Sequence, residues 1–100
     1  MVKVIQERHL NPDSQEQLAP MLRQLRLAVM NQPGYITGET LTNSKDPNHQ
    51  IVIGTFRSLK DWESWKKNKE RNAINKNIRP LLSRAPKITV CNVYQWQAKQ

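Results

Sequence analysis

The sequence predicts an α+β domain in which four antiparallel strands form one sheet and the helices pack against it. Short β-branched runs alternate with segments whose apolar residues recur every three or four positions, the period of a helix. The chain has 100 residues, enough for one domain and too few for two. We therefore treat residues 1–100 as a single domain.

The first half of the chain predicts a strand, a helix and a hairpin. Residues 2–9 are rich in β-forming side chains and predict the first strand. Residues 14–31 carry apolar side chains at helical spacing, and Pro33 and Gly34 follow where this helix ends. A second strand at residues 35–42 and a third at 50–57 are joined by a turn cluster at 44–48, which predicts an antiparallel hairpin.

The second half predicts two helices and a final strand. Ser58 and Asp61 form a capping box that begins a short helix, and a break follows it at residues 68–70. A further apolar stripe through Leu82 predicts another helix, and residues 88–96 predict the last strand. The order β-α-β-β-α-α-β is the ferredoxin-like pattern, a four-stranded antiparallel sheet with helices on one face.

The predicted strands carry apolar residues at both parities. Val4 stands beside Ile5, and Val52 stands between Ile51 and Ile53. Strands that are buried on both faces have this composition. One face meets the helices, and a second copy of the chain is the simplest cover for the other. A chain this short buries only roughly 60–65% of its unfolded surface, so we expect a homodimer.

The charge of the chain is strongly basic. Its formal net charge is +8, and residues 57–87 hold ten basic and three acidic residues, a net of +7. Such a balance favours polyanions as partners. An RNA-recognition sheet stacks bases on aromatic residues of its central strands, whereas residues 50–57 contain one aromatic, Phe56, near the strand end. Nucleic acid is therefore not favoured as a partner. A dimer that binds another polyanion is one option for the function, beside the two given below.

The sequence lacks the patterns of membrane-spanning, secreted and metal-binding proteins. No apolar run approaches the roughly 20 residues of a membrane-spanning helix, and the residues after Met1 do not resemble a signal peptide. Cys91 is the single cysteine, and His9 and His49 lie on different elements without ligand spacing. We expect a cytoplasmic protein that has no membrane contact and no metal.

Two tryptophans and an acid–imidazole pair are the candidate functional residues. Trp62 and Trp65 are three apart and share a helix face, where they either wall a flat apolar ligand or fill the core. A place in the core is favoured for Trp62. For Trp65 the pocket wall and the core are equally favoured. Glu7 and His9 share a face of the first strand, which fits either a proton shuttle or an exposed strand end.

The remaining aromatic pair lies near the end of the chain. Tyr94 and Trp96 share a face of the last predicted strand. Their position favours a core or dimer contact over a functional site.

Three segments of the chain, taken in order, resemble one known family. They are Gln-Pro-Gly-Tyr-Ile-Thr-Gly-Glu-Thr at 32–40, Ile-Gly-Thr-Phe-Arg-Ser-Leu-Lys-Asp-Trp at 53–62 and Ile-Arg-Pro-Leu-Leu at 78–82. Their order and spacing resemble the antibiotic biosynthesis monooxygenase domain family over nearly the whole chain. The resemblance implies a dimeric α/β barrel in which two ferredoxin-like subunits join sheet to sheet.

The same resemblance implies two chemistries. One branch of the family oxidises polycyclic aromatic compounds with molecular oxygen and without metal or flavin. Another degrades haem with an Asn on the first strand, a Trp on the second helix and an iron-ligating His ten residues later. Trp65 matches that Trp, whereas Asn75 stands at the His position and Glu7 at the Asn position. Haem is therefore the weaker option, and no cofactor is expected.

The resemblance thus implies a monooxygenase-like enzyme that acts on a flat, apolar, aromatic small molecule without metal or flavin. The alternative is a non-catalytic dimer that binds or senses a small ligand. In either case the pocket lies between helices and sheet and is lined by Trp62, Trp65, Arg71 and Asn75. Glu7 or His9 is the candidate base, and the charge of Arg71 favours a substrate anion.

Overall fold

The computed structural model describes residues 1–95 and has the predicted order of elements. The elements are β1 (Val2–His9), α1 (Gln15–Met30), β2 (Tyr35–Asn43), β3 (Asp46–Phe56), α2 (Leu59–Lys66), α3 (Lys69–Ile78), a single 3₁₀ turn η1 (Arg79–Leu81) and β4 (Lys87–Asn92). The α+β, ferredoxin-like prediction is confirmed.

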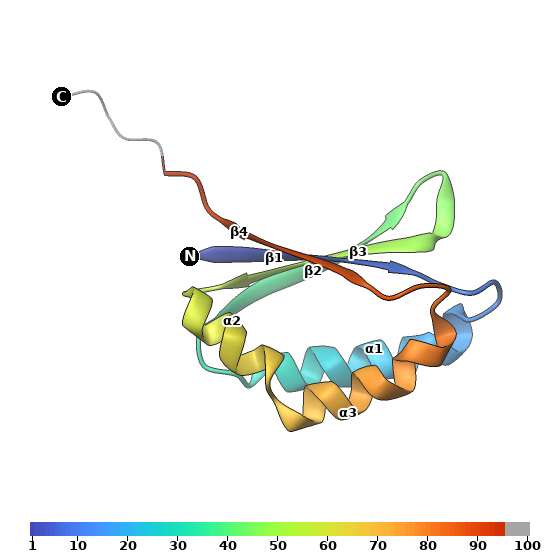
Figure 1. Ribbon diagram of the computed structural model, residues 1–100, viewed down its shortest axis with the longest axis horizontal. Helices are drawn as coiled ribbons and strands as arrows, with labels where there is room; N and C mark the ends of the chain where they lie inside the picture. The colour runs from blue at the N-terminus through green and yellow to red at the C-terminus, as the bar shows by residue number, and fades with distance from the viewer. Residues whose placement is uncertain (96–100) are drawn as a thin grey trace.

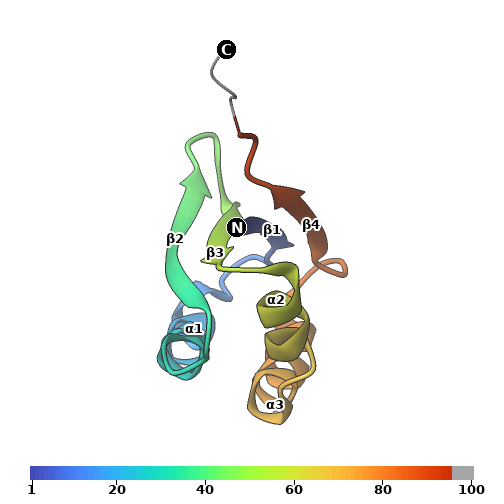
Figure 2. The same ribbon diagram turned by 90° about the vertical axis from the view of Figure 1, so that its left-hand side faces the viewer.

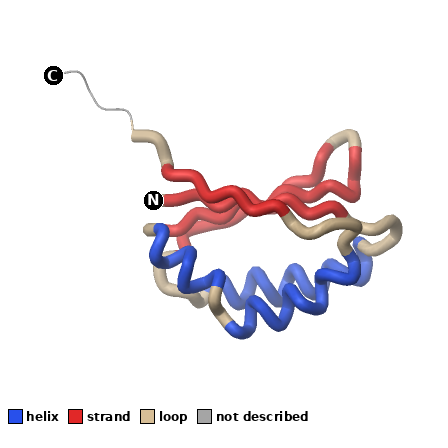
Figure 3. Tube along the Cα trace, viewed as in Figure 1, coloured by secondary structure: helices blue, strands red, loops and turns tan. Residues whose placement is uncertain are grey.

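The four strands form one antiparallel sheet in the order β2-β3-β1-β4. Within residues 1–95, all the helices lie on one face of this sheet, and the other face has no helix over it (Figures 1 and 3). Seen end-on, α1 lies beneath the β2 side of the sheet, whereas α2 and α3 lie beneath the β4 side (Figure 2). No helix within residues 1–95 is long and apolar enough to cross a membrane.

The alternation of side chains along β1 decides which residues face the helices. Val2, Val4 and Arg8 are buried, at 2%, 4% and 4% exposure. Because successive side chains of a strand point to opposite faces, the even-numbered positions of β1 face the helices. The odd-numbered positions, including Glu7 and His9, face the other way.

The core consists of two apolar clusters between the sheet and the helices. The first joins β1, β3, α1 and α2 through Val2, Val4, Ala28, Phe56, Trp62 and Trp65. The second joins the ends of β1, α1 and α3 through Leu10, Leu18, Ile74, Ile78 and Leu82. Both tryptophans are core residues, so the core reading of Trp62 is confirmed and also applies to Trp65.

Two side-chain caps define the break between α2 and α3. The Oγ of Ser58 accepts a hydrogen bond from the backbone N–H of Asp61 at 3.2 Å, so the predicted cap is confirmed. The Oδ1 of Asn68 accepts one from the backbone N–H of Arg71 at 3.0 Å and begins α3. The predicted break therefore lies at Lys67 and Asn68, and it places Arg71 in the first turn of α3.

Two boundaries in the first half differ from the prediction. α1 begins at Gln15 and ends at Met30, one residue inside each predicted end. β3 begins at Asp46 rather than at residue 50, because the hairpin pairing continues until Asp46 stands opposite Asn43. Pro47 lies in this extension, beyond the end of β1, where its missing N–H breaks no pairing with that strand.

Two boundaries in the second half also differ. The last helix ends at Ile78 and continues only as η1, in which Pro80 has no N–H for an α-helical hydrogen bond. β4 ends at Asn92, so the strand prediction was too long, and Tyr94 lies beyond it as an exposed side chain. Trp96 lies outside the described residues.

Gly34 provides the first test of the fold. Its φ is +82°, and an added Cβ would overlap the carboxyl group of Asp61, next to the turn where Arg57 N–H donates to Gly34 O at 2.7 Å. We expect Gly34→Ala to lower the free energy of unfolding by at least ~1–2 kcal/mol, measured by urea denaturation. Gly54→Ala is the control, since its Cβ would meet Phe56 at an ordinary 3.4 Å. Equal losses in both variants would argue against this role for Gly34.

The buried tryptophans provide the second test. Trp62 and Trp65 are 5% and 6% exposed. We expect Trp62→Ala and Trp65→Ala each to lower the free energy of unfolding by about 3–5 kcal/mol, because each leaves a large void in the core. Chemical denaturation measures the loss, and Leu59→Ala, at a position 48% exposed, is the control. Wild-type stability in Trp65→Ala would remove this residue from the core.

Candidate functional site

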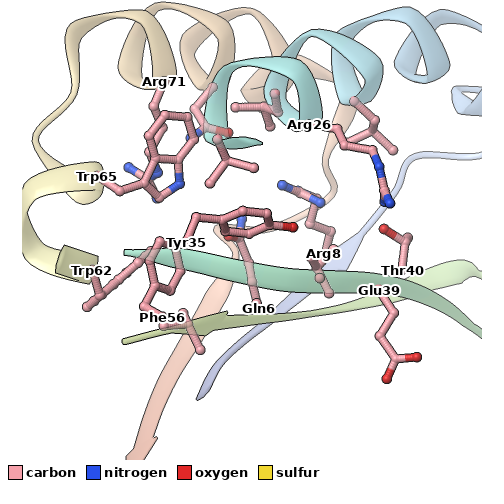
Figure 4. A pocket seen from close by; sticks show the side chains of 18 of the residues that line it. Gln6, Arg8, Arg26, Tyr35, Glu39, Thr40, Phe56, Trp62, Trp65 and Arg71 are labelled. Atoms are coloured by element: carbon pink, nitrogen blue, oxygen red, sulfur yellow. The ribbon is translucent and has the colours of Figure 1, made fainter. Parts of the chain in front are cut away.

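A cavity of about 230 Å³ lies between the helices and the sheet (Figure 4). Side chains from β1, β2, β3 and all three α-helices line it. The four residues predicted for the pocket, Trp62, Trp65, Arg71 and Asn75, are among them. The fold therefore brings together side chains from α2 and α3 that the sequence separates by a helix break.

One end of the cavity is aromatic. The rings of Tyr35 and Phe56 meet edge to face with centroids 5.6 Å apart, and the ring of Phe56 lies 5.7 Å from that of Trp62. Trp65 completes this group in the lining of the cavity. Gly38 leaves space for the Tyr35 side chain, because an added Cβ at Gly38 would come within 2.6 Å of the Tyr35 hydroxyl. This end suits a flat apolar ring.

Arg71 is held in place beside the aromatic group. Its Nη1 donates to the Lys66 carbonyl at the end of α2 and to Asn72 Oδ1, both at 3.1 Å. Its guanidinium also lies 5.5 Å from the ring centroid of Trp62. Burial of the side chain lowers the pKa of Arg71. The cap of α3 and the end of α2 therefore fix a positive charge at the cavity wall.

Arg8 brings a second positive charge to the same cavity. It is 4% exposed, and its Nε and Nη1 have no hydrogen-bond partner within residues 1–95. Burial, with a smaller contribution from the charge of Arg71, lowers the pKa of Arg8 to about 10. A second cavity of about 200 Å³ on the β4 side shares Arg8 and Arg71 in its lining. The two guanidinium groups thus lie between the cavities.

Gln6 and Asn75 are the neutral polar residues beside the arginines, and both line the two cavities. Gln6 shares the larger cavity with Trp65, as do Val4 and Arg8 from the same strand. Glu7, which the family resemblance places at the first-strand Asn, is not among the residues that line either cavity, because only the even-numbered positions of β1 face the helices.

Glu7 and His9 lie on the opposite, helix-free face of the sheet. Glu7 Oε1 is 3.0 Å from His49 Nε2, and Asn43 Nδ2 is 3.1 Å from His49 Nδ1. The ring of His9 stacks on that of His49, with centroids 4.4 Å apart. The expectation that Glu7 or His9 reaches the tryptophan-lined pocket is thus not met within one chain.

The described residues contain no cluster of the side chains that commonly bind metal ions. Residues 1–95 contain no cluster of three or more His, Cys, Asp or Glu side chains that could hold an ion. Both histidines of the sequence lie on the helix-free face, so the cavity beside Trp65 has no imidazole. Asn75, which the family resemblance places at the iron-ligating His, brings an amide to the cavity lining.

Sequence reasoning missed Gln6, Arg8 and Tyr35 as cavity residues. The signal for Gln6 and Arg8 was their parity with Val2 and Val4 on one strand. Because Ile5 is apolar too, parity alone did not identify the face that meets the helices.

Comparison with known proteins agrees with this fold. The profile of the antibiotic biosynthesis monooxygenase family matches residues 1–77. The crystal structure of an antibiotic biosynthesis monooxygenase superposes with a TM-score of 0.87 at 16% identity, covering 95% of this chain and 100% of that chain. Rv0793 from Mycobacterium tuberculosis has a TM-score of 0.85 at 15% identity, with 97% and 98% covered.

SnoaB from Streptomyces nogalater, a cofactor-independent oxygenase, has a TM-score of 0.84 at 10% identity, with 98% and 97% of the two chains covered. At these identities the solved structures establish the fold alone. A search of curated proteins finds no match. The family profile covers more than half of the chain, and the protein belongs to the antibiotic biosynthesis monooxygenase family.

Proposed function

We propose that the protein is a monooxygenase-like enzyme that oxidises a flat aromatic small molecule with molecular oxygen, without metal or flavin. The observation that carries the proposal is the cavity itself, with an aromatic end and two buried arginines. Family membership supports it, as does the likeness in fold to SnoaB, a cofactor-independent oxygenase.

The chemistry needs a substrate that gives up a proton and then electrons. Removal of a proton from an acidic C–H or O–H forms an aromatic anion, which reduces O₂ directly. Without a cofactor, all electrons come from the substrate, so a methylene between aromatic rings becomes a carbonyl while the second oxygen atom leaves as water. Arg8 and Arg71 stabilise the anion electrostatically, and the apolar walls exclude water.

The proton itself has no obvious acceptor in the cavity. Glu39 is the one carboxylate in its lining, and Figure 4 shows its carboxyl group directed away from the arginines. The two positive charges favour the anion of the substrate, so we propose that water at the cavity mouth accepts the proton. Glu7 and His9 remain candidate bases only by a route across the sheet.

The volume of the cavity limits the size of the ligand that it can hold. Drug-sized ligands occupy pockets of roughly 300–1,000 Å³, whereas this cavity holds about 230 Å³. Compounds of up to three fused rings therefore fit better than larger polycyclic compounds or haem.

One observation favours a second candidate function, a non-catalytic ligand-binding or sensing protein. Among the residues that line the cavity, none is a carboxylate or imidazole aimed into it. Such a protein would bind the same flat ligand without consuming oxygen.

We also propose that two copies associate through the helix-free face of the sheet. Ile5 and Ile53 stand opposite each other on that face, as do Ile51 and Leu41, and all four side chains are partly or fully exposed. An exposed apolar face on a small chain is typical of an interface. The family resemblance supports a sheet-to-sheet dimer.

Oxygen consumption distinguishes the two candidate functions. With an aerobic panel of naphthohydroquinones and anthrones, we expect uptake in proportion to protein concentration, above autoxidation and unaffected by EDTA. Arg71→Met should lower the rate by roughly tenfold or more, because a charge that stabilises the anion is lost. An oxygen electrode measures both.

Glu7→Gln is the matched control for this experiment, and its placement across the sheet predicts an unchanged rate. A large loss in Glu7→Gln would instead identify Glu7 as the base. Saturable ligand binding without protein-dependent uptake would favour the non-catalytic function.

The dimer is tested by light scattering. At micromolar concentration we expect twice the 11.7 kDa chain mass, because the apolar face is buried between copies. Ile53→Lys should shift the mass toward the monomer, whereas Lys60→Glu on the exposed face of α2 should not. A wild-type protein that remains monomeric would contradict the sheet-to-sheet arrangement.

A further inference from the structure

The Arg8 guanidinium is buried without the partners that a buried charge ordinarily has. The side chain is 4% exposed, and its Nε and Nη1 make no hydrogen bond to any described residue. An unpaired charge inside a protein is strongly unfavourable, and buried charges are therefore almost always paired.

The neighbours of Arg8 do not compensate this charge. Arg71 is the nearby charge that acts on it, and it is of the same sign. Gln50 stands opposite Arg8 in the β1–β3 register, yet its buried Oε1 is also unpaired, so the two side chains do not satisfy each other. The carboxyl group of Glu39 is directed away from both arginines (Figure 4).

The surroundings of the guanidinium specify what would satisfy it. Arg8 lines the same cavity as the rings of Tyr35, Phe56 and Trp65. A guanidinium offers a planar set of N–H donors that matches a carboxylate in both shape and charge. A more highly charged and more strongly hydrated group, such as a phosphate, suits an apolar cavity of about 230 Å³ less well.

We propose that the cavity binds a small aromatic carboxylate, with its ring against the aromatic end and its carboxylate on Arg8, close to Arg71. The inference deepens the proposed function, since it names the substrate class, and it rests on that function only in placing the ligand in the same cavity. Arg8 orients the ring from the carboxylate end, while the opposite end faces the tryptophans.

Isothermal titration calorimetry with naphthoate and its uncharged isostere naphthamide tests the proposal. The wild-type protein should bind naphthoate at least ~10-fold more tightly, as expected for a charge-assisted hydrogen bond inside a protein. Arg8→Met should remove this preference, and Arg8→Lys should retain part of it. Arg57→Met, which removes an exposed arginine outside the cavity, should leave it intact.

Thermal unfolding without ligand provides a readout that does not depend on binding. Replacement of an uncompensated buried charge by an apolar side chain of similar length stabilises a protein, so Arg8→Met should melt at or above the wild-type temperature. A markedly lower melting temperature would show that the protein itself pairs the guanidinium and would overturn the proposal.

Further outcomes are equally decisive. Equal affinity of the wild-type protein for the two ligands, binding of neither, or a preference that survives Arg8→Met would each overturn the proposal. Preference for naphthoate without oxygen uptake on any substrate would support the carboxylate site and refute the oxygenase. Oxygen uptake with uncharged hydroquinones, without a preference for naphthoate over naphthamide, would support the oxygenase and overturn the carboxylate site.

Discussion

The alternation of side chains along β1 is the constraint on which the rest of the site depends. β1 pairs with both β3 and β4, so its register cannot slip without disturbing strands on both sides. With Val2 and Val4 in the core, Gln6 and Arg8 must face the helices. A shift by one residue would exchange these side chains for Glu7 and His9 and would remove the charge of Arg8 from the cavity.

The helices complete the cavity through local chemistry at the junction of α2 and α3. Asn68 caps α3, and the side chain of Arg71 returns to the last turn of α2, where carbonyl groups attract a positive charge. The same junction directs Trp62 and Trp65 toward the sheet. Trp62 and Trp65 therefore belong both to the apolar core and to the lining of the cavity.

The two faces of the sheet have separate roles. The face under the helices holds the cavity with its aromatic residues and arginines. The other holds exposed apolar residues beside the contact between Glu7 and His49, on which His9 stacks. In the proposed dimer that contact lies near the partner subunit, so Glu7 and His9 belong to the face between subunits rather than to the cavity.

The sequence by itself determined the order of the elements, the family and much of one wall of the site. These depend on signals that are local along the chain, such as the spacing of Trp62 and Trp65 or the cap at Ser58, because helix periodicity and capping act over a few residues. Only the tertiary structure decided which face of β1 is inside, because the strand is apolar at both parities. It also decided the burial of Arg8 and the contact of Glu7 with a histidine 42 residues away. Charge and solvation depend on which side chains meet across the sheet, and strand pairing, rather than local sequence, sets those contacts.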